Sequence, residues 1–114
     1  MARAHPVIEP GARPVITEDF ELVRAIFSLV DEGIVSGYDA FRLEVEVNDD
    51  YIVEELTIEK DSVEVTNAET DFNGAALYDL VQKLRALARA RGENWSEFVI
   101  SYRHGEKVHT KFKY

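Results

Sequence analysis

The most regular patterns of the chain lie in residues 73–114, NGAALYDLVQKLRALARARGENWSEFVISYRHGEKVHTKFKY. Asn73 is a good helix N-cap, because its side-chain oxygen can accept a backbone N–H that the first helical turn leaves unpaired. Apolar side chains then recur at three- and four-residue steps, at Leu77, Leu80, Val81, Leu84, Leu87 and Ala88. The pattern predicts an amphipathic helix from Asn73 to about Arg91 whose apolar stripe faces a core.

A β-hairpin is predicted after this helix. In its first strand Phe98, Ile100 and Tyr102 share one face, and His104-Gly105-Glu106 forms the turn. Trp95 lies between the helix and the hairpin, where it is expected to fill the helix–sheet junction; an exposed anchor for a partner is the alternative. The second strand has an apolar or aromatic face and a basic or imidazole face, the latter formed by Lys107, His109, Lys111 and Lys113.

The N-terminal half shows the same two periodicities. A first amphipathic helix is predicted from Thr17 to about Gly33, because apolar residues recur at helical spacing, at Phe20, Val23, Ile26, Phe27, Val30 and Ile34. Strict alternation of apolar and polar residues predicts a strand over residues 40–48. Two further alternating runs, joined by polar turns, predict strands near residues 51–58 and 63–66.

In the predicted strand near residues 51–58, the apolar residues do not all fall on one face. Tyr51 and Val53 would share one face of a regular strand, whereas Leu56 and Ile58 would share the other. One extra residue in the strand would resolve the conflict, so the pattern predicts a β-bulge at Glu54–Glu55.

The order of elements is therefore α-β-β-β-α-β-β. Tight turns between successive strands favour an antiparallel sheet, and two one-sided helices favour packing on one face of it. We expect an α+β fold in which a sheet of about five strands keeps one face open. The length of 114 residues suits one domain, predicted over residues 17–114, preceded by a flexible N-terminal arm over residues 1–16 that is rich in proline.

The composition of the chain indicates the cellular compartment. The chain has no cysteine, which favours a reducing compartment. It has no apolar run long enough to cross a bilayer, and no secretory signal follows Met1. These features predict a cytoplasmic protein with no membrane partner.

Charge is divided unevenly along the chain, whose formal net charge is -9. Residues 39–71 hold 12 acidic and 2 basic side chains, whereas residues 82–114 hold 8 basic and 3 acidic ones. The acidic excess argues against direct nucleic-acid binding, which depends on Lys and Arg. The open sheet face is expected to carry opposed charge patches and to bind a partner protein.

Few patterns point to catalysis. Glu44 and Glu46 are two residues apart on the solvent side of a strand, as expected for a solvated acidic face. A ribonuclease-like site of His109, Lys111 and Tyr114 is conceivable, but charged residues also protect edge strands from aggregation. The sequence has no Gly-rich phosphate loop and no nucleophile elbow. We expect no enzyme activity, no metal and no cofactor.

Trp95, Gly105 and the terminal pair Phe112 and Tyr114, with the long helix and the hairpin around them, resemble the C-terminal half of the YezG-like immunity protein family. The order of elements over residues 18–114 is also similar to that family. Its members are cytoplasmic proteins that bind and neutralise a cognate bacterial toxin, often a nuclease, delivered to neighbouring cells. The basic last strand and the proline-containing arm depart from the family pattern. The resemblance implies a toxin-neutralising role.

These observations converge on an inhibitor of a cognate toxin domain, most simply a nuclease. An acidic surface can occupy the basic cleft of such a partner. The acidic residues expected to face the toxin are Glu44, Glu46, Asp49, Asp50, Glu54, Glu55 and Asp61. The alternative is a non-catalytic adaptor or dimerisation domain that docks through its open sheet face.

Overall fold

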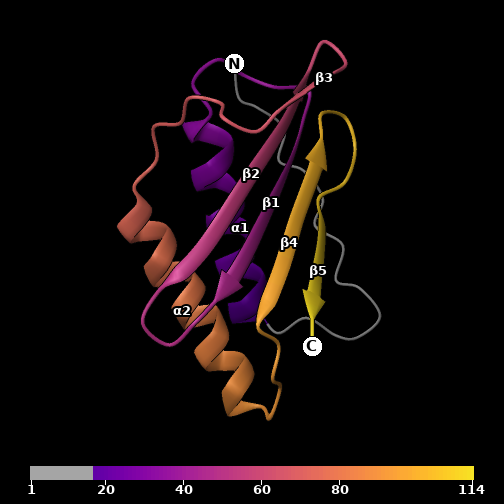
Figure 1. Ribbon diagram of the computed structural model, residues 1–114. Coiled ribbons are helices and arrows are strands. Elements are labelled where there is room, and N and C mark those ends of the chain that lie inside the picture. The colour runs from indigo at the N-terminus through magenta and orange to yellow at the C-terminus, as the bar shows by residue number, and fades with distance from the viewer. Residues whose placement is uncertain (1–16) are drawn as a thin grey trace.

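A five-stranded antiparallel sheet, in the order β3-β2-β1-β4-β5, forms the centre of the molecule (Figure 1). The computed structural model describes residues 17–114, so the predicted N-terminal arm lies outside the described residues. The elements are α1 (Thr17–Gly33), β1 (Ala40–Val47), β2 (Ile52–Lys60), β3 (Val63–Val65), α2 (Gly74–Ala90), β4 (Glu97–Arg103) and β5 (His109–Lys113). The predicted α+β class and order of elements are confirmed.

Helix α2 begins and ends where its sequence predicts. The Asn73 side-chain oxygen accepts hydrogen bonds from the backbone N–H groups of Ala75 at 2.9 Å and Ala76 at 3.2 Å. Gly92, with φ of +82°, follows the C-cap in the left-handed region that favours glycine. The apolar stripe faces the core, with these residues fully buried: Leu77, Val81, Leu84 and Ala88.

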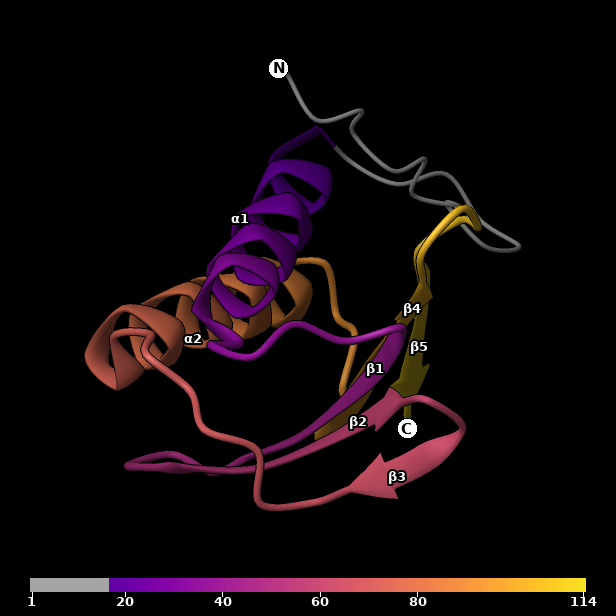
Figure 2. The same ribbon diagram turned by 90° about the horizontal axis from the view of Figure 1, so that it is seen from above.

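Both helices lie on the same side of the sheet (Figure 2). The inward side chains of β1 meet them, and four are buried: Phe41, Leu43, Val45 and Val47. Trp95 is also buried, with its ring centroid 5.7 Å from that of Phe98 and 5.0 Å from that of Phe112. The prediction that Trp95 fills the helix–sheet junction is confirmed, and the alternative of an exposed anchor is wrong.

The predicted bulge in β2 is wrong. Strands β1 and β2 keep one unbroken register from Ala40 opposite Glu59 to Val47 opposite Ile52. Tyr51 precedes the strand, and Val53 lies on the open face with half of its surface exposed. The strand therefore needs no extra residue to bring Val53 to the helix side, because Val53 lies on the solvent-exposed face.

An ion-pair network joins the N-terminal end of α1 to the C-terminal end of α2. The Arg91 guanidinium donates to both carboxylate oxygens of Asp19, at 3.0 and 2.6 Å, and to Glu93 at 2.9 Å. The hydrogen bonds to Asp19 and Glu93 raise the pKa of Arg91 above its ordinary value. Asp19 is only 9% exposed, so the hydrogen bonds from Arg91 offset the cost of removing its carboxylate from water.

Replacing Arg91 with methionine is expected to lower the free energy of unfolding by about 2 kcal/mol, because the Asp19 carboxylate would remain buried without its cation. The matched control is Arg89→Met in the same helix, whose ion-pair partner Asp49 has a side chain 78% exposed. That change is expected to cost less than about 1 kcal/mol. Chemical denaturation measures both, and equal losses would contradict the role given to Arg91.

Candidate partner-binding surface

The face of the sheet opposite the helices is covered by no other element within residues 17–114 (Figure 2). Cross-strand register assigns side chains to this face, because residues paired across an antiparallel ladder share a face. We call it the open face, and its residues on the four longer strands are Ala40, Arg42, Glu44, Glu46, Val53, Glu55, Thr57, Glu59, Glu97, Val99, Ser101, Arg103, His109, Lys111 and Lys113.

A shallow hollow of about 160 Å³ lies on the half of the open face nearest the β1–β2 turn. Val53 and Val99 contribute apolar surface to it, and we call its four carboxylates the acidic quartet: Glu44, Glu46, Glu55 and Glu97. They come from three adjacent strands. Lys113 also lines the hollow, which therefore combines an apolar surface with four carboxylates and one ammonium. This net negative charge suits the methylene stem and cationic head of a further Lys or Arg.

Two members of the quartet have no ion-pair partner within residues 17–114. Glu44 lies 3.3 Å from the Arg42 guanidinium, and Glu97 lies 3.7 Å from the Lys113 ammonium. No cation in the described part of the chain forms an ion pair with Glu46 or Glu55. Glu44 and Glu55 are direct cross-strand neighbours, an arrangement of like charges that destabilises a sheet. A cation from a partner would relieve this repulsion.

The structure divides the seven predicted residues among four places, the last of which is that of Glu54, described below. Glu44, Glu46 and Glu55 meet in the hollow. Asp49 and Asp50 lie in the β1–β2 turn, where Asp49 sits 3.6 Å from Arg85 and 3.4 Å from Arg89 of α2. At the other end of β2, the backbone N–H of Asp61 donates to Asp39 at 2.9 Å. The sequence prediction missed Glu97, because it lies in a stretch whose overall charge is basic.

Glu54 lies on the opposite side of the sheet from its neighbour Glu55. It is the cross-strand partner of Val45, whose side chain is buried on the helix side. Partial burial raises the pKa of the Glu54 carboxyl above its ordinary value. Glu54 and Glu55 thus place charge on both faces of one strand.

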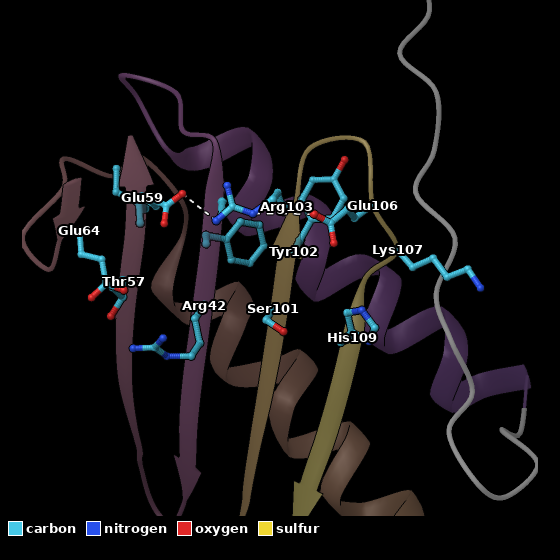
Figure 3. Close-up of a pocket in the computed structure, with 13 residues that line it drawn as sticks. Arg42, Thr57, Glu59, Glu64, Ser101, Tyr102, Arg103, Glu106, Lys107 and His109 are labelled. Carbon is cyan, nitrogen blue, oxygen red and sulfur yellow. Dashed lines mark hydrogen bonds and ion pairs between the residues drawn. The ribbon is translucent and has the colours of Figure 1, made fainter. Parts of the chain in front are cut away.

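A second and larger hollow, of about 390 Å³, lies at the other end of the open face. Figure 3 shows charges of both signs around it, including the Arg103 guanidinium, which donates to Glu59 at 2.6 Å. This hydrogen bond raises the pKa of Arg103. Four polar residues that line this larger hollow form a row across four neighbouring strands: Thr57, Arg42, Ser101 and His109. Basic and acidic side chains are balanced around this hollow, whereas carboxylates predominate around the smaller one.

The residues considered for a ribonuclease-like site are not gathered. His109 and Lys111 lie on the open face, whereas the Tyr114 hydroxyl donates to Glu93 in the α2–β4 loop at 3.3 Å. Residues 17–114 contain no cluster of three or more His, Asp or Glu side chains arranged to hold a metal ion. No helix within the same residues is long and apolar enough to span a bilayer.

No model of a known protein family matches the chain, and no curated protein matches it. The likeness to the YezG-like immunity proteins accordingly rests on the residues quoted above. The features suited to binding a partner are the open face, the acidic quartet and the basic side chains of β5.

Replacing Glu54 with glutamine is expected to raise the thermal unfolding midpoint slightly at pH 7. The raised pKa means that the folded state binds the Glu54 proton more tightly than the unfolded state does, so stability is lost as the pH rises through the unfolded value of 4.5 and the higher folded value. Below pH 4.5 both forms are largely neutral, and the difference should vanish. Differential scanning calorimetry at the two pH values measures the effect. A lower midpoint for the variant at pH 7 would contradict it.

Proposed function

We propose that this protein is a cytoplasmic immunity protein that binds and neutralises a cognate bacterial toxin, with a nuclease effector as the toxin class. The acidic quartet is the centre of its binding surface. The observation that carries the proposal is the meeting of four carboxylates from three strands on a face that no element of residues 17–114 covers. The role is that of a stoichiometric inhibitor.

The electrostatics of a nuclease explain why this surface suits it. A nuclease binds a phosphate backbone through Lys and Arg, so its substrate cleft is basic. The chain has a net charge of -9, and Glu46 and Glu55, which form no ion pair with any described residue, project from the open face. Complementary charge accelerates encounter and selects the partner. The resemblance to the YezG-like immunity proteins supports the same role.

Desolvation favours a partner that supplies cations. Carboxylates lose hydration when a partner covers them, and charge-assisted hydrogen bonds from Arg or Lys offset that loss. Val53 and Val99 provide apolar surface that the partner's methylene groups can bury. A partner with an acidic or purely apolar surface would leave the carboxylates buried and unpaired, which is strongly unfavourable.

The triple variant Glu44→Lys, Glu46→Lys and Glu55→Lys is expected to lose toxin binding by a factor of about 100 or more, because it replaces attraction by repulsion at the centre of the interface. Calorimetric titration with the toxin domain captured from the producing bacterium measures the affinity, and protection of cells expressing the toxin measures neutralisation. Circular dichroism checks that the fold persists.

The matched control reverses three exposed acids of α1 (Glu18, Glu21 and Glu32), which changes the net charge equally on the far side of the molecule. This control is expected to bind nearly as well as the original protein. Unchanged binding by the triple variant of the open face would show that the acidic quartet is not the interface.

An adaptor or dimerisation domain is the second candidate, favoured by a specific charge pattern. One row across the open face runs from Glu55 through Glu44 and Val99 to Lys111, from acidic to basic. Two such faces related by a two-fold axis along the strands would place acid opposite base. Light scattering separates the candidates: the inhibitor is expected to have the monomer mass of 13.0 kDa, and twice that mass would favour dimerisation.

A further inference from the structure

Strand β2 is much longer than the strand on its outer side. Strand β3 pairs with β2 only over residues 58–60, where Ile58 lies opposite Val65 and Lys60 opposite Val63. Over the remainder of β2, residues 52–57, no other strand of residues 17–114 pairs on this side (Figure 1). The sheet therefore has a free edge that continues the line of β3.

The register identifies the backbone groups on this edge. Asn48 N–H donates to the Tyr51 carbonyl at 2.9 Å, which makes these two residues a hydrogen-bonded pair in the β1–β2 ladder. Such pairs recur every second residue in an antiparallel ladder. The backbone groups of Val53, Glu55 and Thr57 therefore point toward β1. Those pointing outward from the free edge belong to Ile52, Glu54 and Leu56.

The negative charge along this free edge favours a basic partner strand. Natural proteins commonly protect free edges with Lys or Pro, but residues 52–57 contain neither. Glu54 and Glu55 instead place a carboxylate on each face of the strand, and neither has an ion pair with a cation in the described part of the chain. Partial burial raises the pKa of Glu54, so its anion would gain from a nearby cation.

We propose that an extended basic segment of a partner protein adds to the sheet as a sixth strand along the free edge of β2. Its backbone hydrogen-bonds to Ile52, Glu54 and Leu56, and its Lys or Arg side chains lie beside Glu54 on one face and Glu55 on the other. This inference rests on the proposed function, since the toxin would supply the segment. It adds backbone recognition to the charge recognition of the open face.

A second copy of this chain does not fit the edge. Antiparallel pairing of two β2 strands about a two-fold axis near Glu54 would place the carboxylates of Glu54 and Glu55 near their own copies. Like charges that face each other across a ladder are destabilising. The edge therefore disfavours self-association and acidic strands, and it accepts a basic strand.

Amide hydrogen exchange on the full chain tests the edge directly. The probe is a short peptide in which pairs of consecutive lysines alternate with pairs of valines, so that an added strand carries lysine on both faces. The matched control has glutamate in place of each lysine. The basic peptide is expected to slow exchange of the Ile52, Glu54 and Leu56 amides by about tenfold or more, because each can gain a strand hydrogen bond. The acidic peptide should slow none of them. Unchanged exchange at these three amides in the presence of the basic peptide would overturn the proposal.

A pair of variants tests the same edge with the captured toxin. Glu54→Pro removes the outward N–H, which a free edge tolerates, whereas Glu54→Gln removes only the charge. The proline variant is expected to bind the toxin about tenfold more weakly than the glutamine variant, owing to the lost hydrogen bond and the bulk of the ring. Equal binding by the two variants would overturn strand addition and leave the proposed function standing. If the basic peptide slows exchange of the edge amides but no toxin is captured from the producing bacterium, strand addition at the edge would be supported and the immunity role contradicted.

Discussion

The alternation of buried and exposed side chains along β1 determines both the core and the charged surface of this protein. This central strand pairs with β2 on one side and β4 on the other. Its inward residues Phe41, Leu43 and Val45 are almost completely buried beneath the two helices. A strand has a side-chain period of two residues, so burying this set forces Glu44 and Glu46 onto the opposite face. The acidic surface is a geometric consequence of forming the core.

Topology then determines which charges meet. Placing β1 between β2 and β4 brings Glu55 and Glu97 beside the acids of β1, while Lys111 lies at the far margin on β5. The short β3 leaves most of β2 without an outer neighbour. The open face and the free edge thus both include β2. A basic partner could therefore contact carboxylate side chains and backbone groups of this strand together. Such combined recognition gives a specificity that surface charge alone does not provide.

The sequence predicted the fold well because its periodic patterns are regular. The apolar stripe of α2, its Asn73 cap and the alternation in β1 each depend on local geometry, which one segment of sequence contains. The predicted bulge was wrong because Val53 was counted with the core, although an exposed face can hold an isolated apolar residue. The alternation of residues within β2 could not reveal which of Glu54 and Glu55 faces the helices, since that depends on how β2 pairs with β1.

The site was predictable only in part, for the same reason. Glu44, Glu46 and Glu55 follow from the alternation of two strands, but Glu97 joins them only through the pairing of β1 with β4. The free edge depends on how few residues of β3 pair with β2, which composition does not determine. Long-range pairing is the information that a local reading of the sequence lacks.

Amide chemical-shift changes on adding the captured toxin domain to the isotope-labelled protein would locate the binding surface directly. If the acidic quartet is its centre, the largest changes are expected on β1, β2 and the adjoining part of β4, centred on Glu44, Glu46 and Glu55. Changes concentrated on the exposed faces of α1 and α2, with the open face unaffected, would contradict it.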